Sequence, residues 1–223
     1  HLCEYVTLLG MQASTCSKMG GEVFTLMKQE FGEVEEPVPP GTVGSSTMPQ
    51  KRNPKLAQDI VAVAAQIRAL VPLALEAMIT EHEANRTTSV MMNRALDQSA
   101  VLTGDLLQYV IELFSGIQVF PERMRANLDL SGGLIMSEAI MLELGRKLGR
   151  QRAHDAVYDA AQASVVESRP FKDTLAEVSE VASNMTPQEI EVLLDPTEYT
   201  GICSLFAQRE AAKAREVAAS LNS

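Results

Sequence analysis

The apolar residues of the N-terminal part of the chain recur at helical spacing. Residues three, four and seven apart share one face of an α-helix, so this pattern predicts a helix over the first thirty residues, with one apolar stripe. Gly20 and Gly21 lie inside the stripe, and each glycine costs about 1 kcal/mol there relative to alanine. We therefore expect an interruption at this pair. The stripe consists of Leu2, Val6, Leu9, Ala13, Cys16, Val23 and Met27.

The helical pattern stops between residues 32 and 54. Five of the ten prolines fall in this stretch, at 37, 39, 40, 49 and 54, together with glycines at 32, 41 and 44. A continuous helix is excluded, because proline lacks the N–H donor and clashes with the preceding turn. Loops of this length are uncommon in compact domains and are usually functional or disordered. The segment is therefore the first place to look for chemistry.

Two more long stripes follow this break. The first predicts a helix of about 25 residues after Pro54, kinked at Pro72. Three long helices with near-heptad spacing predict a bundle with near-parallel packing. Apolar positions outside the main stripes are typical of helices that also pack against other subunits. The two stripes are Leu56, Ile60, Val63, Ile67, Leu70, Ala74 and Ala77, and then Met92, Leu96, Ser99, Thr103, Leu106, Val110 and Leu113.

Shorter helical units follow Phe120-Pro121. Glycines at 132, 133 and 149 separate them, and Thr186-Pro187 is a favourable helix start. No alternating strand pattern stands out. We predict an all-α fold, with part of a long-helix bundle over 1–120, including the loop 32–54, and a smaller helical C-terminal domain over 121–223. The predicted units are 133–148, 150–167, 170–182, 186–194 and 205–221.

Composition and charge narrow the possible functions. With 46% hydrophobic residues in 223, the chain can bury a core, and its net charge of −10 disfavours broad contact with nucleic acid. Three scattered cysteines indicate neither a disulfide framework nor a metal site. We see no membrane span and no signal peptide, and we expect a cytoplasmic protein. Because the chain starts at His1 inside an apolar pattern, we also expect a segment before it.

The break contains a run of polar groups, GSSTMPQKRNP, at 44–54. It combines hydroxyls, an amide and two cations, and it leads into a helix N-terminus, where free N–H groups and the helix dipole favour an anion. A carboxylate or phosphate ligand fits this set. From composition alone, a polar surface loop is the slightly favoured interpretation.

This run resembles the signature loop of the fumarase/aspartase superfamily, GSS-x-MP-x-K-x-NP, and matches all eight defined positions. The upstream EFGEVEEP at 30–37 resembles the acidic run before that loop. Residues 130–157 and 194–201 resemble the last domain of adenylosuccinate lyases and 3-carboxy-cis,cis-muconate cycloisomerases. The resemblance therefore covers most of the chain, corresponds to the second half of such enzymes, and favours this branch.

The resemblance implies a lyase that removes a proton beside a carboxylate and expels a group from the next carbon, usually releasing fumarate. It needs no metal and no organic cofactor. Ser45 would be the general base, acting as an alkoxide when the loop closes. The other implied residues are Ser46, Lys51 and Asn53 for substrate binding, and Gly44 and Met48 for support of the loop and of the developing oxyanion.

Several points stay open on the sequence alone. The resemblance implies a small carboxylate substrate and a homotetramer with shared active sites, with the general acid in a preceding half. We favour an adenylosuccinate lyase-like activity, with a cycloisomerase as the alternative and a non-catalytic helical assembly protein as the alternative of another class. For Arg52 we slightly favour a position facing solvent. For His82 we favour a charged pair on the surface, and for His154 a structural role.

Overall fold

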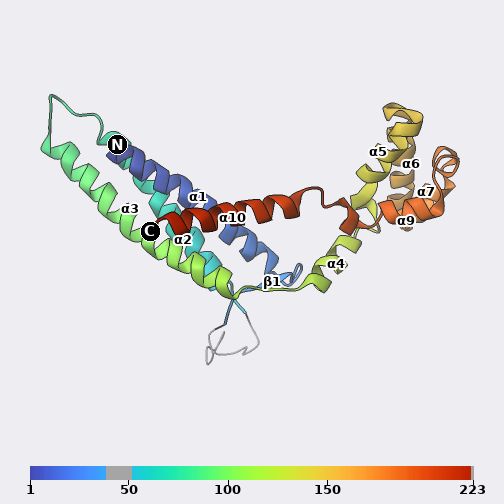
Figure 1. Ribbon diagram of the computed structural model, residues 1–223, viewed down its shortest axis with the longest axis horizontal. Helices are drawn as coiled ribbons and strands as arrows, with labels where there is room; N and C mark the ends of the chain where they lie inside the picture. Colours follow the sequence, from blue (N-terminus) through green and yellow to red (C-terminus); the bar gives the residue numbers. More distant parts are fainter. Residues whose placement is uncertain (39–51, 222–223) are drawn as a thin grey trace. The chain divides into compact units, whose positions relative to one another are not determined.

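A computed structural model describes residues 1–38 and 52–221 of the chain (Figure 1). These residues are almost entirely helical, so the predicted all-α fold is confirmed. The chain separates into two compact units, His1–Met124 and Arg125–Ser223. This division lies four residues beyond the boundary expected from the sequence. Each unit has its own core and is described by itself.

Three long helices build the first unit: α1 (Leu2–Leu26), α2 (Lys55–Glu76) and α3 (Arg86–Gly116). They lie side by side in Figure 1, and their predicted stripes meet in shared cores that contain Val6, Ile60 and Leu106, all fully buried. Helix α2 keeps Pro72 inside it and ends at Glu76. The three-helix bundle predicted from the periodicity is therefore present.

The expected interruption at Gly20 and Gly21 is wrong, because α1 continues through both. A Cβ atom at Gly20 would lie 2.8 Å from Ile60 Cγ2 and 3.0 Å from the carbonyl oxygen of Ala57. Glycine is needed there because α1 and α2 approach closely, whereas Gly21 meets nothing within 4 Å. Close helix packing thus offsets a poor local helix propensity.

Two very short strands join the ends of this unit. Strand β1 (Val34–Glu35) pairs antiparallel with β2 (Gln118–Val119), with Val34 opposite Val119. The sequence shows no strand pattern here, since two residues are too few to alternate, and strands this short leave the all-α fold unchanged. The pairing fixes the start of the 32–54 break to the end of α3.

Helix α2 is the one described helix long and apolar enough, by length and composition, to cross a membrane. Within this chain its buried face, which includes Ile60, Ala64 and Ile67, packs in the bundle core. Leu75 nevertheless remains 52% exposed. The bundle therefore covers only part of the apolar surface of α2, and the predicted absence of a membrane span remains a prediction.

The second unit consists of short helices around one core. Phe171, Ile140 and Leu175 are fully buried at its centre. Helix α4 (Pro121–Asp129), which the sequence did not predict, leads into it, and the predicted unit 170–182 divides into two helices. The elements are η1 (Leu134–Met136), α5 (Ser137–Leu148), α6 (Arg150–Glu167), α7 (Phe171–Glu177), α8 (Ser179–Ala182), α9 (Pro187–Leu193), η2 (Pro196–Tyr199) and α10 (Cys203–Leu221).

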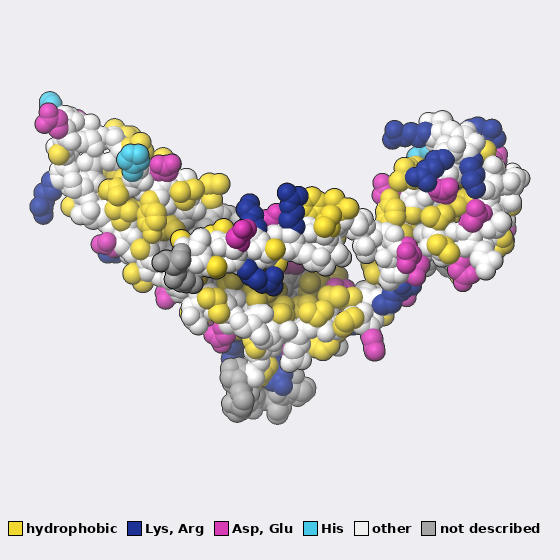
Figure 2. Space-filling view, viewed as in Figure 1, with side chains coloured by type: hydrophobic (Ala, Val, Ile, Leu, Met, Phe, Trp, Pro, Cys, Tyr) yellow, Lys and Arg dark blue, Asp and Glu magenta, His cyan; other side chains and the backbone are white. Residues whose placement is uncertain are grey.

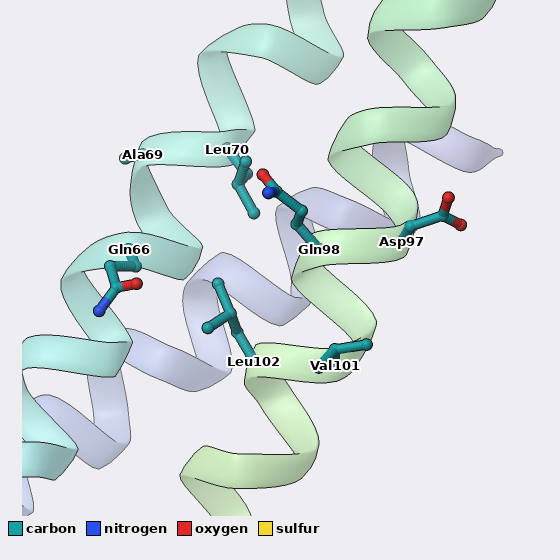
Figure 3. Close-up of a pocket in the computed structure, with 7 residues that line it drawn as sticks. All are labelled: Gln66, Ala69, Leu70, Asp97, Gln98, Val101 and Leu102. Atoms are coloured by element: carbon teal, nitrogen blue, oxygen red, sulfur yellow. The ribbon is translucent and has the colours of Figure 1, made fainter.

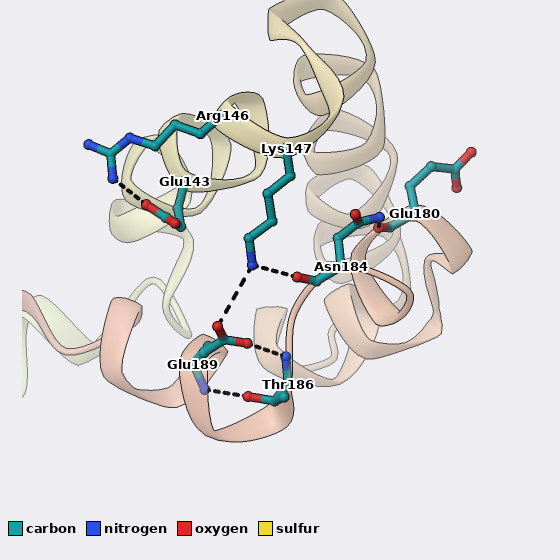
Figure 4. A network of polar contacts seen from close by, with 7 residues as sticks. All are labelled: Glu143, Arg146, Lys147, Glu180, Asn184, Thr186 and Glu189. Carbon is teal, nitrogen blue, oxygen red and sulfur yellow. Dashed lines mark hydrogen bonds and ion pairs between the residues drawn. The ribbon is translucent and has the colours of Figure 1, made fainter.

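Local polar contacts define the helix ends of this unit (Figure 4). The Thr186 hydroxyl accepts from the Glu189 N–H at 3.2 Å, and the Glu189 carboxylate accepts from the Thr186 N–H at 2.6 Å. This capping box fixes the start of α9. Lys147 of α5 donates to the carbonyl oxygen of Asn184 at 2.7 Å and lies 3.7 Å from Glu189. These contacts confirm the helix start predicted at Thr186-Pro187.

Candidate active site

Most of the predicted site lies in a part of the chain that the structure does not describe. Asn53 is described: it is half-buried just before α2, and its carbonyl oxygen accepts from the Lys55 N–H at 2.9 Å. All the predicted roles, that of Asn53 included, remain predictions. The predicted residues outside the described ranges are Gly44, Ser45, Ser46, Met48 and Lys51.

The chain that leads into the signature segment, the run at 44–54, is held against the end of α3. Besides the β1–β2 pairing, the Phe120 N–H donates to the carbonyl oxygen of Glu33 at 2.9 Å. Pro37 packs on Gly116 so closely that a Cβ atom added at Gly116 would lie 2.6 Å from the Pro37 Cβ. Residues 33–37 are thus fixed by partners about eighty positions later in the chain.

Glu36 is the buried polar group of this region, with 5% of its surface exposed. One carboxylate oxygen accepts from the Ala57 N–H at 2.7 Å, and the other accepts from the Leu56 N–H at 3.0 Å. Both donors belong to the first turn of α2, where the partial positive charge of the helix dipole favours an anion. Glu36 therefore caps α2 from the opposite end of the signature segment.

This cap overturns one expectation from the sequence. We expected free N–H groups at the start of α2 to bind an anionic ligand. The Leu56 and Ala57 N–H groups are instead used by Glu36, the Lys55 N–H binds Asn53, and the Gln58 N–H donates to the Pro54 carbonyl oxygen at 3.1 Å. An anionic substrate must therefore be bound by other groups than this helix end.

Arg52 also differs from expectation, because it does not simply face solvent. Its Nε lies 3.1 Å from a carboxylate oxygen of Glu35, and both side chains are partly exposed. Two adjacent acids, Glu35 at the end of β1 and Glu36 just after it, thus bind groups at the end of the signature run and at the start of α2. The acidic run is visible in the sequence but its role is not, since nothing in the local pattern identifies partners some twenty residues away.

His82 lies at the far end of the bundle from these contacts. It is exposed in the turn between α2 and α3, with a left-handed φ of 60°. Helix α2 has 22 residues, which separates its two ends by about 33 Å at 1.5 Å per residue. Within one chain, His82 is therefore too distant to act with the signature segment. The expected charge pair for His82 is not found among the described residues.

A groove of about 530 Å³ lies between α2 and α3, midway along the bundle (Figure 3). Its described lining has one carboxylate, Asp97, two amides, Gln66 and Gln98, and four apolar residues, but no cation. Because a dicarboxylate is bound most strongly by cations, and Asp97 would repel it, this lining disfavours such a ligand. We therefore place the candidate site at the signature segment and not in the groove.

Other reactive groups in the described residues give no competing site. Burial raises the pKa of the Cys16 thiol, so this cysteine stays protonated and is a weak nucleophile. The described ranges contain no group of three or more His, Cys, Asp or Glu side chains placed to hold a metal ion. His154 is exposed beside Asp155, at 3.2 Å, and stacks on Tyr158.

Comparison with known proteins matches both parts of the chain to one group of enzymes. Residues 1–69 match the family model "Lyase", and residues 133–209 match the model "Adenylosuccinate lyase C-terminus". The solved 3-carboxy-cis,cis-muconate lactonizing enzyme from Pseudomonas putida superposes with a TM-score of 0.84 at 33% identity, covering 96% of this chain and 48% of that one. The chain belongs to the fumarase/aspartase superfamily.

Curated members of the superfamily with similar sequences carry different activities. N-acetyl-S-(2-succino)cysteine lyase from Enterococcus italicus is 38% identical over 201 residues, which cover 90% of this chain and 44% of that protein. Trans-aconitate decarboxylase 1 from Mycosarcoma maydis is 40% identical over 209 residues, covering 94% and 42%. The chain thus spans about half the length of the relatives it matches. Similarity of this degree gives the superfamily but not the substrate.

Proposed function

We propose that this chain is part of a lyase that carries out β-elimination on a succinyl-type substrate and releases fumarate, with Ser45 as the general base. The observation that carries the proposal is the run at 44–54, which has every defined position of the superfamily signature. The name of the 38% identical lyase, which acts on an S-succinylated cysteine, supports a succinyl group as the common part of the substrate.

The chemistry assigns a role to each signature residue. Ser45, as an alkoxide, removes the proton from the carbon beside a carboxylate, and the electron pair moves into that carboxylate as an aci-anion. Lys51 and Asn53 bind the carboxylate by charge and by hydrogen bonds, and Ser46 and the Gly44 N–H donate to the growing charge. The bond to the leaving group then breaks, and the leaving group takes a proton from a general acid outside the residues assigned here.

Serine is a weak base at its ordinary pKa, so Ser45 needs an electropositive site without water. Lys51 supplies positive charge six positions away in sequence, and Met48 supplies apolar cover. Because the N–H groups at the start of α2 are used by Glu36, we assign the substrate carboxylate to Lys51 and Asn53. No metal or organic cofactor is part of the proposed reaction.

A substrate panel tests the proposal. The complete protein is incubated with adenylosuccinate, N-acetyl-S-(2-succino)cysteine and other succinylated amines and thiols, and fumarate is measured by its ultraviolet absorbance. We expect fumarate from at least one of them, with adenylosuccinate-like substrates tried first because residues 133–209 match the adenylosuccinate lyase model. Absence of fumarate from the whole panel would contradict the elimination proposal.

The second candidate is 3-carboxy-cis,cis-muconate cycloisomerase. The superposition on the lactonizing enzyme, with a TM-score of 0.84, favours it. The same signature residues would serve, because this reaction also involves a proton on a carbon beside a carboxylate. The two candidates differ in product: the cycloisomerase interconverts a carboxymuconate and its lactone and releases no fumarate. A non-catalytic helical assembly protein is disfavoured, because it has no need for the complete signature at 44–54.

We also propose a cytoplasmic homotetramer with active sites shared between copies. Apolar side chains lie exposed along the bundle helices (Figure 2), including Val90, Val101 and Ile111 of α3, which are 56%, 67% and 60% exposed. Surface of this kind is typical of helices that pack against another subunit. Light scattering of the purified protein tests the assembly: a mass of four chains is expected, and a monomer would contradict it.

A further inference from the structure

Polar contacts join the chain before the signature segment to the chain at its end and beyond it. Glu35 and Glu36 precede the run at 44–54, whereas their partners are Arg52, near the end of that run, and Leu56 and Ala57, which follow it. We call these five residues the clasp. Its two hydrogen bonds to α2 link positions 20 and 21 residues apart.

Helix α2 is capped by a residue distant in sequence, and not by its own N-cap residue. The common solution is a Ser, Thr, Asp or Asn at the N-cap itself, whose side chain reaches the N–H groups two or three positions later. Here the N-cap is Pro54, which makes no side-chain cap. The cap comes instead from Glu36, a buried residue that precedes the segment in the sequence. The contact that caps α2 therefore also connects the chain before the signature segment to the chain after it.

Burial makes this contact specific. An ionised carboxylate that is 5% exposed is costly unless its oxygens are satisfied, and both oxygens of Glu36 accept an N–H. A shift of the entering chain along α2 would leave an unpaired charge in the core. Pro37 on Gly116 and the β1–β2 pairing also hold the chain at 34–37. The described chain before and after residues 39–51 is thus held by several contacts.

We propose that Glu36 is a positioning residue for the elimination reaction: by clasping α2, it sets where the signature residues are presented to the substrate. This inference rests on the proposed function. Its chemical reason is that proton removal needs the base within hydrogen-bond reach, and a displacement of about 1 Å costs as much as 100-fold in rate. Glu36 touches neither substrate nor reacting atoms in this role, so it acts through the segment it anchors.

The test replaces Glu36 with glutamine, which keeps the size but removes the charge and puts an amide NH₂ against one N–H of α2. Glu30→Gln is the matched control, because Glu30 is an exposed acid of the same acidic run. Both variants of the complete protein are assayed well below their melting temperatures, so that the folded fraction is equal. We expect kcat of Glu36→Gln to fall about 10- to 100-fold, with KM changed less than kcat, while Glu30→Gln keeps the kcat of the unaltered protein.

A second readout does not depend on activity. Trypsin cleaves after arginine, and we expect cleavage after Arg52 to be about 10-fold faster in Glu36→Gln than in Glu30→Gln, because loss of the cap lets the chain between Arg52 and Ala57 open more often. If Glu36→Gln fails to fold, Glu35→Gln serves instead. It breaks only the partly exposed pair with Arg52, and a smaller change in the same direction is expected for both readouts.

The outcomes separate the two proposals. Equal kcat and equal trypsin rates in Glu36→Gln and Glu30→Gln overturn the inference. A faster trypsin rate with an unchanged kcat also overturns it, because Glu36 would then stabilise the fold without positioning the reaction. If Ser45→Ala retains full activity, the proposed function fails. In that case the trypsin comparison still shows whether the clasp exists.

Discussion

The two units of the molecule fix their polar groups in different ways. In the bundle unit, the contact next to the signature segment is buried and joins distant parts of the sequence. Glu36, with 5% of its surface exposed, accepts hydrogen bonds from Leu56 and Ala57, which lie 20 and 21 residues later. Arg123 likewise donates to the carbonyl oxygens of Glu30 and Phe31 more than 90 residues away.

In the C-terminal unit, most polar contacts are local and exposed. The capping box joins Thr186 and Glu189, three positions apart, and the partly exposed Arg169 pairs with the exposed Glu167 and Glu177. The guanidinium of Arg169 holds the pKa of Glu177 below its usual range through a hydrogen bond. Stability of this unit therefore comes mainly from its apolar core. The difference indicates that the buried, long-range polar contact lies next to the signature segment, whereas polar contacts elsewhere are mostly local.

The largest effect should follow loss of the C-terminal core. Phe171 is fully buried among Ile140, Leu144 and Leu175, and its replacement by alanine leaves a cavity. We expect Phe171→Ala to lower the free energy of unfolding by about 3–5 kcal/mol in urea titrations. Phe206→Ala, at a residue 53% exposed, is the control. Equal losses in the two variants would mean that burial is not what stabilises this unit.

A smaller effect is expected where α1 meets α2. In Gly20→Ala the new methyl group would lie 2.8 Å from Ile60 Cγ2, so we expect a loss of about 1–3 kcal/mol in the same titration. Gly21→Ala meets nothing within 4 Å and should stabilise the helix by about 0.5–1 kcal/mol. The two neighbouring substitutions thus differ in sign. A gain in stability from both would remove the close approach of α1 and α2 as the reason for Gly20.

The smallest effect concerns the exposed caps of the C-terminal unit. Hydrogen bonding to the Thr186 N–H holds the pKa of Glu189 below its ordinary value of 4.5. A lowered folded-state pKa contributes stability above the ordinary value, and this contribution is lost as pH falls through the lowered one. Glu189→Gln should therefore be slightly less stable than the unaltered protein at pH 7, and the difference in melting temperature should close in acid. A difference that is constant with pH would exclude the carboxylate charge as its cause.

Much of the fold could be predicted because the relevant signals are local. The spacing of Ile60 and Ile67 marks a helix wherever its partners are, and Thr186-Pro187 marks a helix start from two adjacent residues. The segments 150–167 and 187–193 were found in this way to within a residue. Gly20 was misinterpreted because its local cost is visible in the sequence, whereas the neighbouring helix that requires it is not.

The candidate site could be predicted only by its signature. GSSTMPQKRNP gives the roles of Ser45, Lys51 and Asn53 by resemblance, and these roles remain predictions. Two contacts were missed: the cap by Glu36 and the pair of Arg52 with Glu35. Both join residues that are far apart in the sequence, and the sequence does not show that the chain brings them together. Long-range polar contacts of this kind leave no periodic signal.

The most direct test of the account is the turnover of Ser45→Ala in the complete protein, with the fumarate-releasing substrate found in the panel. Removal of a general base should lower kcat by about 10²- to 10⁴-fold, while the fold and substrate binding stay largely intact. The account predicts this loss, together with an unchanged circular dichroism spectrum. A kcat close to that of the unaltered protein would contradict it, because Ser45 would then not be the base.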